Sequence, residues 1–191
     1  MKLYAFPATP NNRKVVAFIR HYDLAVEVHT VSFKNQEQRQ PEFLQINPMG
    51  QVPALVDGDH YLWESNAILT YLARCFPSCN ALPTDIWGRA DTDRWLHWQS
   101  AHLTPLMGGL KTGLVEVTSL EPLLNVLNIQ LEHREFILNT LSLCDFAIAP
   151  YLLTKLGDKL DYSGYPELAD WRRRMAKLKG FTETELRSPT V

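Results

Sequence analysis

The chain has 191 residues, 46% of them hydrophobic and 21% charged, with a formal net charge of −2 at pH 7. This composition is typical of a globular protein that needs no metal or disulfide to stabilise its core. The low net charge argues against a large nucleic-acid footprint, which requires a strongly basic surface. No secretory signal is evident, and no segment approaches the ~20 apolar residues of a membrane helix. With only three cysteines, the sequence predicts a soluble, cytoplasmic protein.

The first part of the chain alternates between strand and helix patterns. Strand segments alternate apolar and polar residues, whereas helical segments repeat apolar residues three or four positions apart. Asp57-Gly58 between two apolar runs is a strong hairpin signal. In chain order, the predicted elements are strand Lys2–Phe6, a turn from Pro7 to Asn12, helix Arg13–Tyr22, strand Glu27–Phe33, helix Pro41–Ile46, strands Ala54–Val56 and Tyr61–Trp63, and a helix that begins at Ser65.

After Asp85 the strand alternation disappears and helical periodicity takes over. Ser142 followed by Asp145 resembles a capping box, with Asp in place of the usual Glu or Gln, and predicts a helix start. The predicted helices are one that carries Trp87 to Leu106 and is interrupted or ended by Gly108, Gly109 and Gly113, a second over Leu120–Leu138, a third from Ser142, and a fourth after Pro166 that carries Leu168, Trp171, Met175 and Leu178.

These elements predict two domains of different class. The order β-α-β-α-β-β-α over residues 1–76 is that of a thioredoxin-like domain. Residues 77–84 are expected to be a linker, and residues 85–191 an all-helical domain. The expected fold class is therefore α/β plus all-α, with the thioredoxin-like domain first.

Two short motifs lie near the end of the first predicted domain. The first is Gly50-Gln51-Val52-Pro53-Ala54-Leu55, and the second is Trp63-Glu64-Ser65-Asn66-Ala67-Ile68. At this spacing the chain resembles the glutathione-binding half of the cytosolic glutathione transferases of the Ser/Thr type, which include the theta, phi and nu classes. The resemblance implies the glutathione transferase fold, glutathione as co-substrate without a metal, and a homodimer.

Val52-Pro53 matches the position where this family places a cis-proline. The resemblance implies a cis bond here, although most X-Pro bonds in folded proteins are trans. A cis bond would turn the backbone N–H and C=O of Val52 outward. There they would pair with the cysteinyl backbone of a bound peptide, as an added strand does.

Glu64-Ser65 matches the family's acid and hydroxyl pair before a helix. The resemblance implies that the γ-glutamyl carboxylate lies at Ser65 and the helix N-terminus, where backbone N–H groups favour an anion. Glu64 would pair with the ammonium of the ligand. Ser65 could also serve only as the N-cap of its helix, and the two roles are compatible.

Three further residues are expected near the glycyl carboxylate of the peptide. Gln38 and Arg39 lie where plant-type members carry His and Lys, so Arg39 keeps the positive charge and Gln38 departs from the pattern. Gln51 lies where several classes have Lys or Gln. Arg39 could equally be a solvated loop charge.

The group that activates the thiol is expected just before the first helix. Thr9 falls where Ser-type members carry the catalytic serine, and Thr9-Pro10-Asn11 looks like the nu class, in which Thr and Asn both approach the glutathione sulfur. The resemblance implies Thr9 and Asn11 as catalytic residues, with helix capping alone as the alternative. The absence of cysteine from this segment argues against classes that use a protein thiol.

Other candidate sites are weaker. His97 and His102 lack the spacing of a common helical pair of metal ligands. Trp95 and Trp98 could border an apolar substrate pocket, but aromatic residues at this spacing are more often part of a core. The basic run Arg172–Arg174 lies late in a predicted helix, where the dipole favours cations, so we expect a solvated face.

The sequence leaves three functions open. The first is a glutathione transferase that conjugates the glutathione thiolate to small apolar electrophiles, with a role in detoxification. The second, suggested by the nu-like Thr9-Pro10-Asn11, is a glutathione-dependent disulfide reductase or peroxidase. The third is a non-catalytic, transferase-like interaction module.

Overall fold

A computed structural model describes residues 1–6 and 8–184. Pro7, predicted to lie in the first turn, and residues 185–191 of the predicted helical half lie outside the described residues. The chain divides into two compact units, residues 1–76 together with the segment from Leu178 onward, and residues 77–177.

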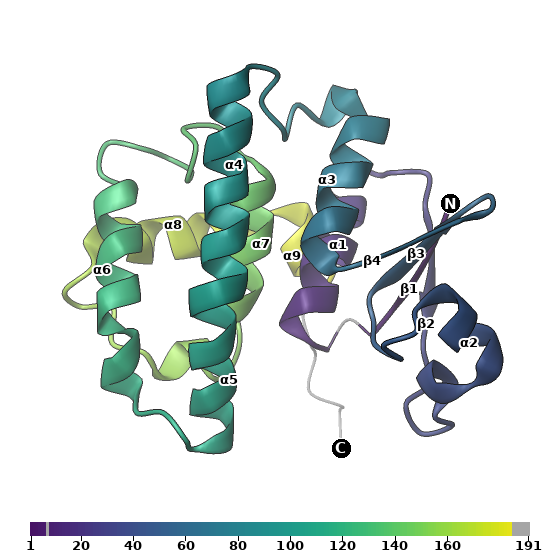
Figure 1. Ribbon diagram of the computed structural model, residues 1–191. Coiled ribbons are helices and arrows are strands. Elements are labelled where there is room, and N and C mark those ends of the chain that lie inside the picture. The colour runs from purple at the N-terminus through teal and green to yellow at the C-terminus, as the bar shows by residue number, and fades with distance from the viewer. Residues whose placement is uncertain (7, 185–191) are drawn as a thin grey trace. The chain divides into compact units, whose positions relative to one another are not determined.

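A mixed four-stranded sheet forms the centre of the described part of the first unit (Figure 1). Its spatial order is β2-β1-β3-β4, with β1 parallel to β2 and antiparallel to β3, and β3 antiparallel to β4. The hairpin predicted at Asp57-Gly58 is confirmed. The strands are β1 (Lys2–Ala5), β2 (Glu27–Thr30), β3 (Ala54–Asp57) and β4 (His60–Trp63).

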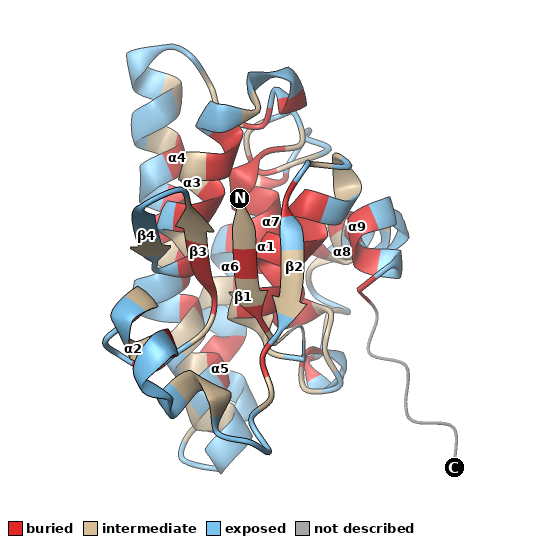
Figure 2. Cartoon of the chain, turned by 90° about the vertical axis from the view of Figure 1, so that its right-hand side faces the viewer, coloured by how far each residue is buried: buried red, intermediate tan, exposed pale blue. Residues whose placement is uncertain are grey.

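Helices cover both faces of this sheet. Two helices pack against each other on one face, and a third lies on the opposite face, as Figures 1 and 2 show. The paired helices are α1 (Pro10–His21) and α3 (Ser65–Cys75), and the third is α2 (Pro41–Ile46). The largest buried apolar side chains between sheet and helices include Leu3, Phe18, Leu55, Ile68 and Leu69. The predicted thioredoxin-like order is thus confirmed.

A short final helix, α9 (Lys179–Thr182), also belongs to the first unit, although the sequence analysis placed its residues with the helical half. It packs on α1 through Gly180, where an added β-carbon would lie 2.0 Å from the carbonyl oxygen of Ala17. Arg13 on α1 donates hydrogen bonds to the Phe181 carbonyl at 3.2 Å and to the Thr184 hydroxyl at 3.3 Å. No local sequence pattern reports such a contact between distant residues.

The second unit is helical throughout its named elements, as predicted. Its helix α7 is buried at every position, so it has no solvent-facing stripe. The longer helices are α4 (Ile86–Trp98), α5 (Thr104–Thr112), α6 (Glu121–Gln130), α7 (Leu143–Leu152) and α8 (Pro166–Lys177).

The capping box predicted before α7 is confirmed. The Asp145 carboxylate is fully buried and accepts hydrogen bonds from the backbone N–H of Ile137 at 3.0 Å and the indole N–H of Trp171 at 2.8 Å. It also accepts from the Ser142 N–H at 2.9 Å and hydroxyl at 2.8 Å. Burial raises the pKa of Asp145, while these donors favour its ionised form.

Several predicted boundaries differ from the structure. The first long helix does not stop at Gly108 and Gly109 but continues past them to Thr112. A π-helical turn, Gln99–Leu103, joins α4 to α5 just before Pro105, a residue without a backbone N–H. Gly113 ends α5 with a positive φ of 74°.

The predicted helix Leu120–Leu138 is too long, because α6 ends at Gln130. Leu131 and Ile137 remain fully buried outside the helix, so the apolar spacing continues where the helix does not. Likewise, β2 ends at Thr30 rather than Phe33, since the chain turns there and the Gln36 N–H donates to the Phe33 carbonyl at 3.1 Å.

The residues predicted to form a linker belong to the second unit. Pro77–Cys79 forms a 3₁₀ turn, and the Ala81 carbonyl accepts a hydrogen bond from the Leu143 N–H at 3.0 Å. Ala81 is buried, so this stretch is held by packing as well as by hydrogen bonding.

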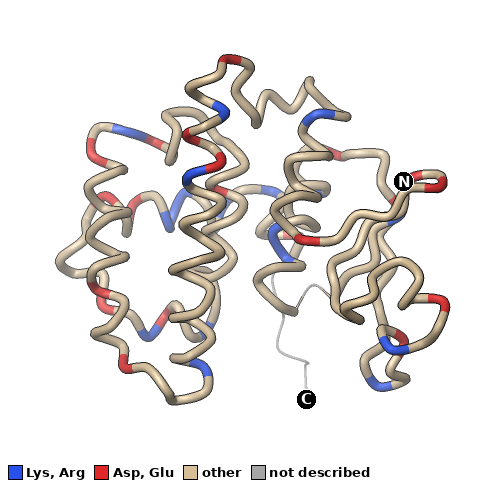
Figure 3. Tube along the Cα trace, in the orientation of Figure 1, with Lys and Arg blue, Asp and Glu red and all other residues tan. Residues whose placement is uncertain are grey.

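Charges of both signs are interspersed along both units (Figure 3). In the basic run, Arg172 pairs with Asp158, Arg173 pairs with Asp170, and Arg174 donates to the Glu135 carbonyl at 3.0 Å. Among residues 1–6 and 8–184, no helix combines the length and apolarity needed to cross a membrane.

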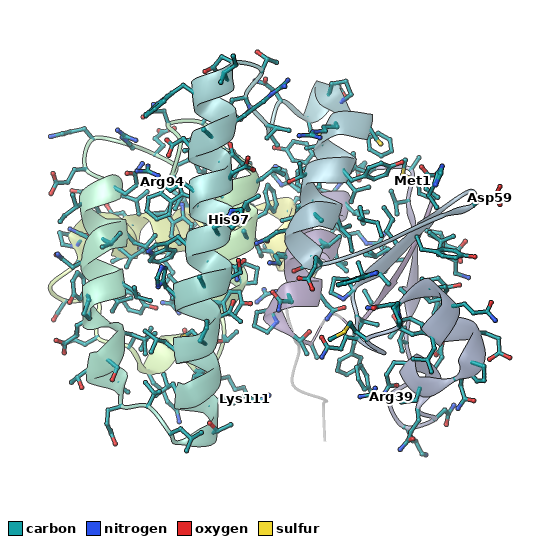
Figure 4. All side chains as sticks on the ribbon, in the orientation of Figure 1. Met1, Arg39, Asp59, Arg94, His97 and Lys111 are labelled. Atoms are coloured by element: carbon teal, nitrogen blue, oxygen red, sulfur yellow. The ribbon has the colours of Figure 1, made fainter. Side chains whose placement is uncertain are left out.

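Two other candidates from the sequence have structural assignments. Trp95 is buried and packs edge-on against Trp98, as expected for a core residue. His97 on α4, labelled in Figure 4, is exposed, and its Nδ1 lies 2.7 Å from the Asp93 carbonyl oxygen. The described residues contain no group of three or more His, Cys, Asp or Glu side chains placed to hold a metal.

Candidate functional site

A cleft in the first unit brings together three segments that are distant in the sequence: the start of α1, the loop between α2 and β3, and the junction of β4 with α3. Its volume is about 60 Å³ and it opens to solvent, so it is a shallow groove and not an enclosed pocket of roughly 300–1,000 Å³. The cleft is lined by Asn11, Asn47, Met49, Gln51, Val52, Pro53, Trp63, Glu64 and Ser65.

Most of the residues in this lining were predicted from the sequence. Asn47 and Met49 were not predicted, because an Asn after a helix and a single apolar residue carry no functional pattern of their own. Trp63 begins the second motif, but no role in the site was predicted for it. Thr9, Gln38 and Arg39 were predicted but are outside the lining. The predicted residues that do line the cleft are Asn11, Gln51, Val52, Pro53, Glu64 and Ser65.

The loop that contains Val52-Pro53 is held by Asn47, the residue that follows α2. The Asn47 side chain donates to the Gln51 carbonyl at 2.7 Å and accepts from the Met49 N–H at 3.0 Å. Asn47 is buried, so both bonds are shielded from water. The predicted cis peptide bond between Val52 and Pro53 is confirmed.

The backbone of Val52 is only partly available to a ligand. Its N–H donates to no group among residues 1–6 and 8–184. Its carbonyl already accepts a hydrogen bond from the Asn12 side chain at 3.1 Å, which the sequence analysis did not anticipate. A carbonyl oxygen has two lone pairs, so a second donor fits there.

Asn12 connects the cleft to the start of α1. Its side-chain oxygen accepts from the Phe6 N–H at 3.0 Å, and its amide donates to the Thr9 hydroxyl at 2.6 Å as well as to Val52. It is 2% exposed. Asn12 was not predicted as a site residue, because a second Asn in a helix start is indistinguishable from an ordinary polar residue.

Thr9 occupies the N-cap position of α1, with extended backbone angles, but its side chain makes no capping hydrogen bond. Its hydroxyl oxygen accepts a hydrogen bond from Asn12. Among the described residues, the acceptor for the hydroxyl proton is the Phe6 carbonyl, at a long distance of 3.5 Å. Accepting one hydrogen bond strengthens a hydroxyl as a donor. The Thr9 hydroxyl is therefore suited to donate to an anion.

The β4–α3 junction carries the acid and hydroxyl pair. Glu64, rather than Ser65, is the N-cap residue of α3, and its φ of 72° is unusual for a residue with a β-carbon. Ser65 is the first helical residue, and its hydroxyl donates to the Asn11 side chain at 3.3 Å. Strained backbone of this kind is concentrated at functional sites.

Gln38 and Arg39 flank the cis-proline loop. Gly50, at a φ of 59°, passes so close that a β-carbon there would lie 3.0 Å from the Gln38 carbonyl and 2.7 Å from the Arg39 guanidinium. The side-chain oxygen of Gln38 is buried without a partner among the described residues. Arg39 is exposed and lies next to α2 (Figure 4).

A buried cation lies behind the site. Lys14 on α1 is 1% exposed, and its ammonium donates to the Asn66 side chain at 2.6 Å. Burial lowers the pKa of Lys14 to about 7, and the nearby Glu64 carboxylate opposes part of this effect.

The fold and this site agree with what comparisons with known proteins show. Residues 1–74 match the family model described as "Glutathione S-transferase, N-terminal domain". Glutathione S-transferase 3 of Zea mays is 34% identical over 148 residues, which is 70% of this chain and 66% of that protein. Disulfide-bond oxidoreductase YfcG of Escherichia coli is 30% identical over 193 residues, covering 89% of this chain and 87% of that protein.

Solved structures agree with these relationships. A glutathione transferase from Burkholderia graminis, with two glutathione molecules bound per subunit, superposes with a TM-score of 0.85 at 28% identity, over 99% of this chain and 88% of that one. A glutathione transferase from Pseudomonas putida, with one glutathione disulfide bound per subunit, superposes with a TM-score of 0.84 at 27% identity, over 96% of this chain and 89% of that one. The chain belongs to the glutathione transferase family. It spans less than two thirds of several plant relatives, for example 19% of glutathione S-transferase T3 of Arabidopsis thaliana.

Proposed function

We propose that this protein binds glutathione in the cleft and transfers its thiolate to small apolar electrophiles. The observation that carries the proposal is the hydrogen-bond chain from Val52 through Asn12 to Thr9, which joins the peptide-binding loop to the start of α1. Bound glutathione in related transferases from Burkholderia graminis and Pseudomonas fluorescens supports it.

The peptide would be held along its whole length. The Val52 N–H, which has no acceptor among the described residues, would donate to the cysteinyl backbone. Ser65 and the N-terminus of α3 would bind the γ-glutamyl carboxylate, and Glu64 the ammonium. Gln51, Gln38 and Arg39 would bind the glycyl carboxylate from the side of the loop.

Ionisation of the thiol requires only modest stabilisation. A free thiol has a pKa of ~8.5, and lowering it by about two requires roughly 2.7 kcal/mol. A hydrogen bond to an ionised group supplies ~1.5–3 kcal/mol, and a helix N-terminus about 0.3–1 kcal/mol. A donor hydroxyl at Thr9, the amide of Asn11 and the start of α1 together meet this demand.

The reaction then needs no group on the protein beyond those that hold the anion. The thiolate sulfur attacks the electrophilic carbon, a carbon–sulfur bond forms, and the leaving group departs with its electron pair. A protein nucleophile is unnecessary, because the co-substrate supplies the sulfur.

Glutathione-dependent disulfide reduction is the second candidate. The resemblance to YfcG over most of the chain and the glutathione disulfide bound to the Pseudomonas putida relative favour it. In this reaction the thiolate attacks a disulfide sulfur and releases one thiol. A second glutathione then resolves the mixed disulfide, so two glutathione molecules are oxidised to one disulfide.

The setting is part of the proposal: a cytoplasmic homodimer that acts in detoxification without a metal. Exposed apolar side chains support self-association, since large apolar groups on a surface often mark an interface. They include Trp87 on α4 at 80% exposure and Tyr61 on β4 at 52%.

Side-by-side assays test the proposal. The protein is incubated with glutathione and either 1-chloro-2,4-dinitrobenzene or 2-hydroxyethyl disulfide. We expect conjugation with the first substrate. Turnover of the disulfide alone would favour the second candidate, and retention of glutathione without turnover would indicate an interaction module.

A further inference from the structure

Lys14 is the most unusual charged residue in the first unit. A lysine is almost never fully buried unless it is paired, because its ammonium loses hydration. Here the side chain is 1% exposed and points from α1 toward the first turn of α3. The thiol chemistry proposed above makes no use of it.

Lys14 contacts the turn that carries the acid and hydroxyl pair. Its ammonium donates to the side-chain oxygen of Asn66 at 2.6 Å, and Asn66 directly follows Ser65. Glu64 is the charged group that acts on it electrostatically. Lys14 therefore contacts, from inside the fold, the turn whose outer surface faces the cleft.

Other charged groups on the elements around α1 have different partners. Arg13, the neighbour of Lys14, bonds to Phe181 and Thr184 in the C-terminal segment. Lys179 on α9 pairs with Asp23, beyond the end of α1. At Lys14, burial lowers the pKa and the Glu64 carboxylate opposes part of that shift.

A structural role alone does not account for a lysine here. Methionine has a similar length, has no charge to desolvate and packs well in irregular apolar spaces. Replacing a buried charge by an apolar side chain is often neutral or stabilising, and Glu64 is exposed, so water would solvate it after the replacement. A buried ammonium at this position lowers the free energy of unfolding, and such a loss of stability is common at residues that are kept for function.

We propose that Lys14 is a positioning residue for the γ-glutamyl end of glutathione, so that it sets the preference for γ-glutamyl peptides over peptides without that group. This inference rests on the proposed binding of glutathione in the cleft. The ammonium orients Asn66, and with it the first turn of α3. It also adds positive potential where the γ-glutamyl carboxylate binds.

The test compares two ligands that lack a reactive thiol, S-methylglutathione and S-methylcysteinylglycine, by calorimetry with the full chain. In Lys14→Met we expect the affinity for S-methylglutathione to fall about tenfold, while that for S-methylcysteinylglycine stays within about twofold. The melting temperature should not fall. The matched control is Lys111→Met, which removes an exposed lysine on α5 and should change neither affinity (Figure 4).

A second variant, Asn66→Ala, removes the side-chain oxygen that accepts from Lys14 and keeps the lysine. We expect the same selective loss for S-methylglutathione, so the inference stays testable even if Lys14→Met fails to fold. Equal losses of affinity for both ligands, or no loss for either, would overturn this inference and leave the proposed function standing. If the wild-type protein binds no S-methylglutathione, the proposed function fails and the inference fails with it.

Discussion

The side-chain amide of Asn12 donates a hydrogen bond to the hydroxyl of Thr9 over 2.6 Å. The same amide nitrogen donates to the Val52 carbonyl at 3.1 Å, so one buried side chain connects the cis-proline loop to the start of α1. The contact restricts the Thr9 hydroxyl, because its proton must point away from the Asn12 amide that donates to its oxygen.

The Thr9 hydroxyl should be the side-chain group that contributes most to thiol activation. Thr9→Val keeps the shape of the side chain and removes the donor, so we expect the pKa of bound glutathione to rise and conjugation to slow about tenfold or more. The pH dependence of kcat/KM reports this pKa. Thr9→Ser keeps the hydroxyl and should behave as the wild type. An unchanged pH profile in Thr9→Val would exclude the role.

Asn12 should stabilise the fold as well as the site. Asn12→Ala removes three hydrogen bonds and leaves the Phe6 N–H without its acceptor, so we expect a loss of about 1–3 kcal/mol in the free energy of unfolding. Denaturant titration measures this loss. Asn125→Ala, on an exposed position of α6, should change stability by less than about 0.5 kcal/mol. Equal effects of the two substitutions would contradict the assignment.

Much of the first unit could be predicted from the sequence because its signals are local. Alternation defines the strands, and Asp57-Gly58 defines the hairpin. Local patterns fail beyond α6, where the apolar residues Leu131 and Ile137 continue the helical spacing and are buried but lie outside a helix. The position of α9 depends on Gly180 meeting α1, a contact that is invisible in a local window.

The candidate site shows the same division. Glu64, Ser65 and Val52 lie in motifs with a fixed spacing, and the cleft contains all three. Asn12 and Lys14 were missed because their roles arise from packing: each is buried and bonds to a residue about 40 or 50 positions away. A polar residue in a helix start carries no sign of such a partner.

Gly50 should tolerate substitution less well than Gly58. Both glycines have a positive φ, 59° and 56°, so the left-handed conformation would cost alanine about 1–2 kcal/mol at either position. Only at Gly50 does a β-carbon meet the Gln38 carbonyl and the Arg39 guanidinium, whereas nothing lies within 4 Å at Gly58. Gly50→Ala should therefore unfold at lower denaturant than Gly58→Ala and should bind glutathione more weakly. The reverse order would contradict the geometry of this loop.

Lys14 should make stability depend on pH. Its pKa is 10.5 as a free side chain and about 7 in the fold, so between these values the unfolded chain binds more protons than the folded one. Stability of the wild type therefore rises with pH across this window, and is lowest, with respect to this group, below pH 7. The difference of 3.5 between the pKa values corresponds to roughly 5 kcal/mol at most.

Lys14→Met removes this contribution. We expect the variant to exceed the wild type in free energy of unfolding most clearly near pH 6, with the gap narrowing as the pH approaches 10. Denaturant titrations at both ends of the range measure the gap. Lys111→Met should follow the wild type at every pH, since Lys111 is exposed. A gap that stays constant with pH would contradict the burial of the Lys14 ammonium.

The central claim is that the glutathione sulfur is held as an anion beside the start of α1. Ultraviolet absorbance of the thiolate, recorded on the complex with glutathione over a range of pH, tests it most directly. The account predicts that the bound thiol ionises about two pH units below the ~8.5 of the free thiol, and that Thr9→Val raises this pKa part of the way toward the free value, since Asn11 and the start of α1 remain. A bound thiol that titrates like free glutathione in the wild-type protein would contradict the account.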